Sequence, residues 1–210
     1  MLTTCWSSME KNFQFVASRI KIQQSNHEME NAVTTKERLK PIVNKDSEIL
    51  ILGSLPGKKT LDANKNNKGA PKYYCNPTNR FWKIVASLNG TVVPADNDSR
   101  VSLLKPLRIA LWDVYKSAEG NGSLDSDLRN CKFDFDSILE FLRQHSGIKT
   151  VVFNGRKASK IFAENYRDEL NKALAPRKIE FQDLTSTSKA NTSCTEEVLI
   201  KTWQAALVQK

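Results

Sequence analysis

The sequence predicts an α/β sandwich in which helices flank a mostly parallel central sheet. Three observations predict it: four short apolar segments, amphipathic segments between them, and a polar or glycine-containing loop after each apolar segment. The apolar segments have the length and the aliphatic or β-branched composition of buried strands. They are Glu48–Gly53, Arg108–Trp112, Lys149–Asn154 and Lys178–Leu184.

Helical periodicity appears between and after these strands. The predicted helices are Phe81–Leu88, Phe135–Arg143, Lys157–Tyr166 and Glu196–Val208. In the first of them Phe81, Val85 and Leu88 fall on one face, as expected for a helix that packs against a sheet. Strands and helices that alternate in this way form parallel sheets covered by helices.

The loops that follow the predicted strands are unusual in composition. They are Gly53–Gly57 (GSLPG), Asp113–Tyr115 (DVY), Gly155–Lys157 (GRK) and Thr185–Asn191 (TSTSKAN). In open parallel sheets, ligands bind in the crevice outside the carboxyl ends of the strands. We therefore expect these four loops to converge on one site.

Composition favours a polyanionic partner. The 210 residues fit one domain with a real core, and they include 32 lysines and arginines against 23 acidic residues. The excess is concentrated between Gly57 and Lys83, where seven basic residues accompany a single acidic one, Asp62. A patch of this kind is typical of proteins that bind nucleic acid.

Cysteine and histidine usage argues against a metal site and against a disulfide framework. The cysteines form no C-x-x-C pair, and only two histidines could join them: the residues are Cys5, Cys75, Cys131, Cys194, His27 and His145. No apolar run is long enough to span a membrane. We expect an intracellular protein with reduced thiols, in the cytoplasm and nucleoid or in the nucleus.

The chain is expected to divide into an N-terminal extension, residues 1–34, and one domain, residues 35–210. The extension lacks the pattern of a secretory signal, and it holds Arg19 and Lys21 with few acidic residues before Glu28. We favour a flexible or start-site extension over the alternative, a mitochondrial presequence.

Each loop has a structural and a functional interpretation. Gly53–Gly57 can be an ordinary turn or can bring backbone N–H groups close to a ligand, although it is no P-loop. The hydroxyls of Thr185–Asn191 can bind phosphate oxygens or cap a helix. Asn154 and Asp113, at the ends of two strands, can contact a polar ring or hold their loops.

The segment Tyr73–Trp82 (YYCNPTNRFW) is the densest mixture of aromatic and amide residues in the chain. Asn79 is a good N-cap for a helix that starts at Arg80. Tyr73 and Tyr74 can belong to the core, but rings between basic residues are also typical of surfaces that stack on nucleic acid bases. Both interpretations stay open on these residues alone.

Taken together, the motifs resemble the uracil-DNA glycosylase superfamily, most closely its hypoxanthine-DNA glycosylase branch. The matching pieces stand in the family's order: Ile49–Gly57, Tyr73–Trp82, Leu111–Arg129, Val151–Gly155 and Leu184–Asn191. The resemblance covers roughly residues 40–208, with a local similarity to mismatch-specific uracil-DNA glycosylases around Asn79–Trp82. It implies a three-layer sandwich with a mostly parallel central sheet.

The resemblance also implies a reaction. The expected enzyme is a monofunctional glycosylase that flips a deaminated base, hypoxanthine first and uracil second, and hydrolyses its N-glycosidic bond in base excision repair. It needs no metal and no cofactor, and its partner is double-stranded DNA that contains deaminated bases. We expect it to act as a monomer, and nothing in the motifs singles out a lysine for Schiff-base chemistry.

Site residues follow from the matching motifs. Asn79 is the expected catalytic residue, which orients water or polarises the base, and Tyr74 is the expected stacking platform. The base pocket is expected to include Ser54, Leu55, Tyr74, Asp113, Phe153 and Asn154. DNA contacts are expected from Lys72, Arg80, Ser186, Thr187, Ser188, Lys189 and Asn191.

The sequence departs from the family pattern at several positions. Leu55 stands where many members have the Asp or Asn that positions water, which favours the hypoxanthine branch. Asn76 replaces a common histidine, and Thr185 and Lys189 replace common prolines. The departures leave a rival hypothesis, a non-catalytic nucleic-acid-binding protein that retains the fold. A zinc-dependent deaminase is set aside, because its H-x-E and P-C-x-x-C ligands are absent.

Overall fold

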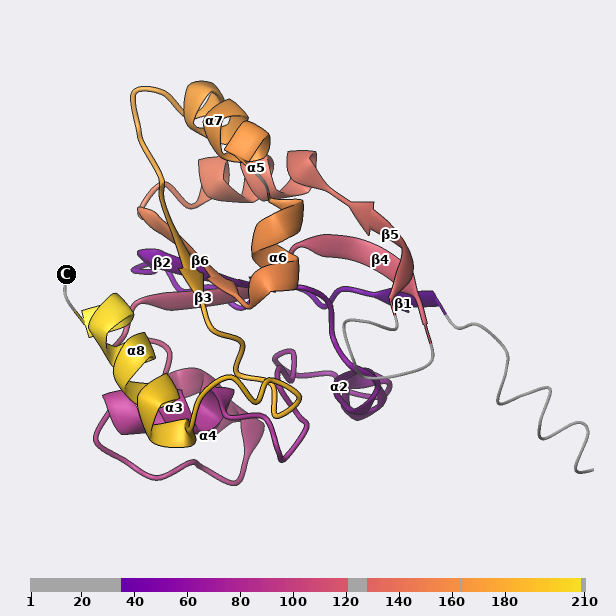
Figure 1. Cartoon of the computed structure of the whole chain (residues 1–210), viewed down its shortest axis with the longest axis vertical. Coiled ribbons are helices and arrows are strands. Elements are labelled where there is room, and N and C mark those ends of the chain that lie inside the picture. Colours follow the sequence, from indigo (N-terminus) through magenta and orange to yellow (C-terminus); the bar gives the residue numbers. More distant parts are fainter. Residues whose placement is uncertain (1–34, 121–127, 163, 209–210) are drawn as a thin grey trace, which may run out of the picture. The chain divides into compact units, whose positions relative to one another are not determined.

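A parallel four-stranded sheet forms the centre of the described part of the chain, in the order β3-β2-β6-β7 (Figure 1). Its strands are β2 (Ile49–Gly53), β3 (Ile109–Asp113), β6 (Thr150–Asn154) and β7 (Glu180–Leu184). The computed structural model describes residues 35–120, 128–162 and 164–208. The predicted extension, residues 1–34, lies outside these residues.

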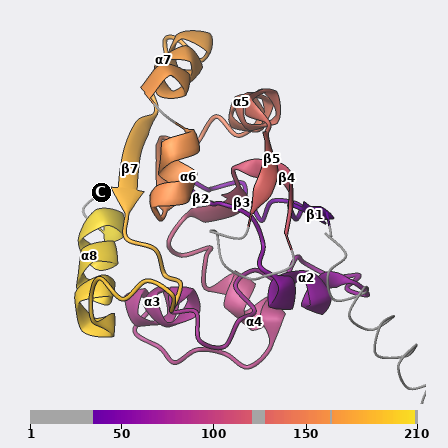
Figure 2. The same cartoon turned by 45° about the vertical axis from the view of Figure 1, so that its right-hand side comes forward.

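Helices cover both faces of this sheet, so that three layers result (Figures 1 and 2). One face carries α5 (Phe135–Gln144), α6 (Arg156–Ile161) and α7 (Glu164–Ala173), and the other carries α3 (Phe81–Leu88) and α8 (Glu196–Val208). Each face has its own apolar core, because alternate strand residues point in opposite directions. Val152 packs with α3 and α8, whereas its neighbour Phe153 packs with α6 and α7. The predicted three-layer α/β sandwich is confirmed.

The central strands are apolar throughout because both of their faces are covered. All residues of β2, β3 and β6 are buried, and their parallel register pairs Ile49 with Ile109 and with Thr150. The predicted bounds of the four strands hold to within one or two residues. The predicted helices Phe81–Leu88 and Glu196–Val208 have the observed bounds.

A second, three-stranded antiparallel sheet was not predicted. It consists of β1 (Thr35–Glu37), β4 (Tyr115–Glu119) and β5 (Arg129–Phe133), in the order β1-β4-β5. The strands are short and alternate irregularly between buried and exposed residues, so their sequence has no clear strand periodicity.

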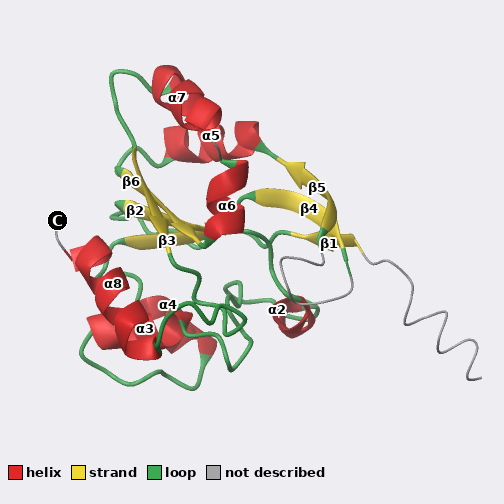
Figure 3. Cartoon of the chain, viewed as in Figure 1, coloured by secondary structure: helices red, strands yellow, loops and turns green. Residues whose placement is uncertain are grey.

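Other departures concern helices. The predicted helix Lys157–Tyr166 is two helices, α6 and α7, and Phe162 between them is fully buried against Phe153. The short helices α2 (Lys58–Asn64) and α4 (Asn97–Ser102) were not predicted. Figure 3 shows long loops before α3 and before α8. These two loops and the carboxyl ends of the strands form the site.

Candidate active site

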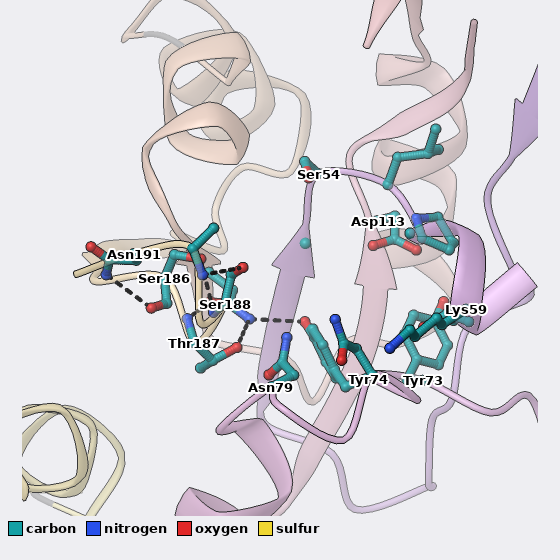
Figure 4. Close-up of a pocket in the computed structure, with 18 residues that line it drawn as sticks. Ser54, Lys59, Tyr73, Tyr74, Asn79, Asp113, Ser186, Thr187, Ser188 and Asn191 are labelled. Carbon is teal, nitrogen blue, oxygen red and sulfur yellow. Dashed lines mark hydrogen bonds between the residues drawn. The ribbon is translucent and has the colours of Figure 1, made fainter. Parts of the chain in front are cut away.

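A pocket of about 490 Å³ lies at the carboxyl ends of β2, β3 and β6 (Figure 4). Its walls come from the GSLPG loop, α2, the segment before α3, and the loop after β7. Ten of the predicted site residues line it: Ser54, Leu55, Tyr74, Asn79, Asp113, Asn154, Ser186, Thr187, Ser188 and Asn191. The expectation that the strand-end loops converge on one crevice is therefore confirmed for the loops after β2 and β7. Asp113 is the residue of Asp113–Tyr115 that lines the pocket, and the predicted loop Gly155–Lys157 after β6 does not line it.

Asp113 brings a buried carboxylate to the pocket. It is the last residue of β3, stands in register with Gly53 of β2, and is only 4% exposed. A Cβ atom on Gly53 would lie 2.6 Å from Asp113 Oδ1 and 3.4 Å from the Tyr74 hydroxyl oxygen. Glycine at position 53 thus lets the carboxylate and the hydroxyl approach the end of β2.

Groups around Asp113 respond to its charge. Burial lowers the pKa of the Arg38 guanidinium, while the charges of Asp134 and Asp113 act in the opposite direction. Burial, and after it the charge of Asp113, raises the pKa of the Tyr73 phenol well above its usual value. Asp113 therefore lies in a region where buried charges interact with little screening.

The Asn154 side chain joins three parts of the pocket wall. Its Nδ2 group donates to the Tyr74 hydroxyl at 3.1 Å and to Thr187 Oγ1 at 3.0 Å, and its Oδ1 accepts from the Thr187 N–H at 2.9 Å. Both amide hydrogens are used within the protein, so in this conformation Asn154 has no N–H left for a ligand.

Tyr74 is held in an uncommon conformation. Its φ of 53° lies in the left-handed region, which non-glycine residues seldom adopt. The ring stacks on Phe81 of α3, with centroids 4.2 Å apart and planes at 27°. Tyr74 is partly exposed and lines the pocket, as its expected role as a stacking platform requires.

Asn79 lies immediately before α3. Its Oδ1 accepts from the Phe81 N–H at 2.9 Å, so it caps the helix, although the helix begins at Phe81 and not at Arg80. Its Nδ2 group has no acceptor among the described residues. Asn79 lines the pocket (Figure 4). An amide group in this position can donate to a base or to water.

The expectation that Arg80 contacts DNA is not supported. Its side chain is 4% exposed, and its guanidinium donates to main-chain oxygens within the loop after β7. The acceptors are the carbonyls of Ser186, Thr187, Ser188, Asn191 and Cys194, at 2.8 to 3.5 Å. Arg80 therefore stabilises this loop from the inside and has no exposed face for a phosphate.

Thr187 is also a structural residue of this loop. It is fully buried, its hydroxyl accepts from Asn154, and its carbonyl accepts from the Arg80 N–H at 3.0 Å. A direct phosphate contact by its side chain would require the loop to open. Ser186, Ser188 and Asn191 are partly exposed, and Lys189 is exposed beside the pocket without lining it.

Phe153 and Lys72, two of the predicted site residues, do not line the pocket. Phe153 was expected in the base pocket, but it is fully buried in the core beneath α6 and does not line the pocket, because it points to the other face of the sheet from Val152. Lys72 also lies outside the pocket lining; its main chain bonds to Asn64.

One lining residue with a charge was missed. Lys59 of α2 is exposed and is the one basic side chain among the described residues of the pocket wall. The signal was the pair Lys58-Lys59 directly after GSLPG, which was not recognised because α2 was not predicted. The lining also includes Asn76, whose Oδ1 accepts from the Thr78 hydroxyl at 3.0 Å.

The described residues contain no cluster of three or more His, Cys, Asp or Glu side chains that could hold a metal ion. Within the same part of the chain, no helix is long and apolar enough to cross a membrane.

Comparisons with known proteins agree with the fold and the motifs. No family model matches the chain. The chain is 33% identical over 124 residues to a hypoxanthine DNA glycosylase of Methanosarcina barkeri. The matched region covers 59% of this chain and 73% of that protein. The chain is also 34% identical over 119 residues to a hypoxanthine DNA glycosylase of Methanosarcina acetivorans. This matched region covers 56% of this chain and 69% of that protein.

A solved structure agrees with the sequence relatives. A solution NMR structure from Methanosarcina acetivorans, provisionally assigned as a uracil DNA glycosylase, superposes with a TM-score of 0.64 at 27% identity, and the match covers 83% of this chain and 97% of that one. Fold, ordered motifs and relatives point to the same group. The chain belongs to the uracil-DNA glycosylase superfamily, as a homologue of its hypoxanthine DNA glycosylases.

Proposed function

We propose that this protein is a monofunctional DNA glycosylase that excises a deaminated base, hypoxanthine first and uracil second, by hydrolysis of the N-glycosidic bond. The observation that carries the proposal is the pocket, where Asn79, Tyr74 and Asp113 meet at the carboxyl ends of the sheet. Its volume of about 490 Å³ falls in the range of small-molecule sites, and it has room for a flipped base.

Asn79 is the catalytic residue in this proposal. Cleavage builds negative charge on the leaving base and positive charge on the sugar. The Nδ2 group of Asn79, which has no acceptor among the described residues, can donate to the base or to the attacking water, while its Oδ1 stays fixed by the Phe81 N–H. Leu55, which is apolar, cannot take this role.

Tyr74 supplies the aromatic platform. Its ring is supported from behind by Phe81, so it can stack on an extruded base without first being ordered. Stacking on an aromatic side chain is worth about 1–3 kcal/mol per base, which offsets much of the cost of extrusion. The cost is smallest for a mispaired base, and deamination creates mispairs.

The pocket rim contacts the DNA backbone. Lys59 and Lys189 are exposed on two sides of it, and the partly exposed Ser186, Ser188 and Asn191 provide polar groups for phosphate or for the gap left by the flipped nucleotide. The enzyme acts as a monomer on double-stranded DNA, in the compartments that hold DNA.

The test is excision from duplex oligonucleotides that each carry one hypoxanthine, uracil or xanthine opposite each normal base, followed by alkali to reveal abasic sites. We expect the fastest excision for hypoxanthine. Excision led by uracil would overturn the order of substrates. Binding to the same duplexes without any abasic product would replace the proposal with the rival, a binding protein that retains the fold.

A further inference from the structure

A loop rich in lysine connects α2 to the segment that carries Tyr74. It consists of residues 65–72 (KNNKGAPK) and is called the lysine loop below. It holds three lysines and no acidic residue; Lys65 and Lys68 are exposed and Lys72 is partly exposed. A loop of this length can be a plain connection between two elements. Its order, its place beside the pocket and its charge indicate a further role.

Amide side chains hold the main chain of the lysine loop in one conformation. Asn64, the last residue of α2, donates from Nδ2 to the Lys72 carbonyl at 2.8 Å and accepts at Oδ1 from the Lys72 N–H at 2.9 Å. This pair of bonds closes the loop at its two ends. Within the loop, Asn67 donates to the Ala70 carbonyl at 2.8 Å, and Asn97 of α4 donates to the same oxygen at 3.2 Å. These bonds order the main chain, so the lysine side chains are not needed to hold it.

Both ends of the lysine loop lie beside the pocket. At one end, Asn64 also donates to the carbonyl of Thr60, a pocket residue, at 2.7 Å. At the other end, Tyr74 of the pocket follows Lys72 by two residues. Lys68 is four residues from each end, so it lies within about 14 Å of the closure. Neighbouring phosphates of a DNA strand are about 3.4 Å apart along the duplex axis, so several of them fall within this reach.

The charge of this part of the chain favours an anion. Residues 58–72 hold five lysines and one acidic residue, Asp62. Asp62 lies 2.9 Å from the Lys65 ammonium group, and both side chains are exposed. An exposed pair of this kind is worth at most about 1 kcal/mol, so a phosphate can replace the carboxylate. Lys68 and Lys72 pair with no acidic side chain in the described part of the chain.

We propose that the lysine loop binds DNA phosphates next to the flipped nucleotide, and that Asn64 keeps the loop in the conformation that does so. The inference rests on the proposed function and deepens it, because it adds a contact surface outside the pocket. Figure 4 shows Lys59, on the α2 side, across Asn79 and Tyr74 from the loop after β7. The two loops thus hold the DNA backbone from two sides of the flipped base. Phosphate contacts position the duplex and carry no sequence information.

The test is binding of the full chain to a duplex that carries one hypoxanthine on 2′-fluoroarabinose, which blocks cleavage. The association constant is measured over a range of salt concentrations. For the double variant Lys65→Ala/Lys68→Ala we expect about 10- to 60-fold weaker binding near 0.1 M salt. Its salt slope should be smaller by about 2, since each lost phosphate contact removes about 1.

Lys105→Ala/Lys178→Ala is the matched control. It removes the same charge at two exposed residues that shortly precede β3 and β7, at the opposite end of the sheet from the pocket. Its affinity and salt slope should stay close to those of the wild type. Equal effects of the two double variants would overturn the inference, because the lysines of the loop would then act through net charge alone.

Asn64→Ala tests the conformation of the loop, since it keeps every lysine. Without the closure, the lysines must be ordered when DNA binds, so we expect about 3- to 10-fold weaker binding. Asn66→Ala, at an exposed asparagine of the same loop, should bind as the wild type does. If Asn64→Ala binds as tightly as Asn66→Ala, the role of Asn64 is wrong.

Cleavage of an ordinary deoxyinosine duplex by the wild type is measured in parallel. If no abasic product forms, the proposed function fails. The binding of the four variants to the uncleavable duplex decides the role of the lysine loop separately, because it does not depend on catalysis.

Discussion

At the scale of single residues, the site depends on polar side chains whose partners lie on other segments of the chain. Asn79 caps α3 and keeps its amide hydrogens for the pocket, while Asn154 spends its own on Tyr74 and Thr187. Asn79 is partly exposed whereas Asn154 is buried, and the two asparagines thus have different capacities to bind a ligand. Their hydrogen bonds, more than their positions, separate the proposed catalytic residue from the structural one.

Gly53 is a residue whose function is to leave space. In Gly53→Ala the added Cβ would lie 2.6 Å from Asp113 Oδ1, so the carboxylate has to move. We expect a loss of about 1–3 kcal/mol in the free energy of unfolding, as for overpacking of a buried site, together with slower excision. Urea unfolding and single-turnover excision measure the two effects.

Gly69→Ala is the control for this prediction. Gly69 is exposed, and the nearest atom to an added Cβ is 3.9 Å away, so the substitution should leave stability and excision unchanged. If Gly53→Ala behaves in the same way as Gly69→Ala, the close packing of Asp113 against β2 has no functional importance.

At the scale of elements, α3 and the loop after β7 form one unit. Arg80 precedes α3, and its guanidinium binds five carbonyls of the loop. In this arrangement a buried cation has backbone carbonyls as its hydrogen-bond partners, and the loop that forms one wall of the pocket is ordered around it. Phe81 of α3 supports the Tyr74 ring on one side of the pocket. Through Arg80, the start of the same helix also holds the loop after β7 on the other side.

Arg80→Gln should disrupt this unit. The shorter amide reaches few of the carbonyls, and those left without a donor are costly to bury, so we expect a loss of roughly 2–4 kcal/mol in the free energy of unfolding. Cleavage by trypsin after Lys189 should become faster as the loop loosens. Chemical denaturation and timed proteolysis provide the measurements.

Lys83→Gln on the same helix is the matched comparison. Lys83 is exposed and pairs with Glu196 at 2.9 Å, a surface contact whose loss should cost less than about 1 kcal/mol. Equal effects of the two substitutions would contradict the internal role of Arg80.

Some of these relations could be predicted from the sequence and others could not. The apolar runs of β2, β3 and β6 and the periodicity of α3 and α8 are local signals, so the central sheet and these two helices were predicted within a residue or two. The approach of the GSLPG, Asn79 and Thr185–Asn191 segments followed from the rule on strand ends and from the family resemblance. Neither the strand-end rule nor the resemblance predicts whether a given side chain in these segments points into the pocket or into the core.

The errors share that cause. Arg80 and Thr187 were expected at the DNA surface because arginine and threonine often bind phosphate, but their burial depends on the path of a distant loop. Phe153 was expected in the pocket, although strand alternation turns it to the other face from Val152. The β1-β4-β5 sheet and α2 were not predicted because their segments are short and mix polar and apolar residues with weak periodicity.

At the scale of the whole molecule, the net charge of +9 provides attraction to DNA that does not depend on sequence. The pocket itself contributes little to this charge, since Lys59 and Asp113 are its charged lining residues within the described chain. Most of the positive charge that can attract a duplex therefore lies on residues outside the pocket lining.

Salt dependence separates these contributions. The logarithm of the DNA association constant should fall linearly with the logarithm of salt concentration, and Lys59→Ala should reduce the slope by about 1 if Lys59 neutralises one phosphate. Lys149→Ala should leave the slope unchanged, because Lys149 precedes β6 at the opposite end of the sheet and pairs with Glu48. A slope that responds equally to both changes would place the DNA elsewhere.

In the proposed reaction, Asn79 catalyses excision of a deaminated base in this pocket. The most direct measurement is single-turnover excision of hypoxanthine from a duplex by the wild type and by Asn79→Ala, with circular dichroism to show that both are folded. We predict efficient excision by the wild type and a rate about 10²- to 10³-fold lower in the variant, the usual cost of removing one oriented donor. Full activity in folded Asn79→Ala would contradict the catalytic role of Asn79.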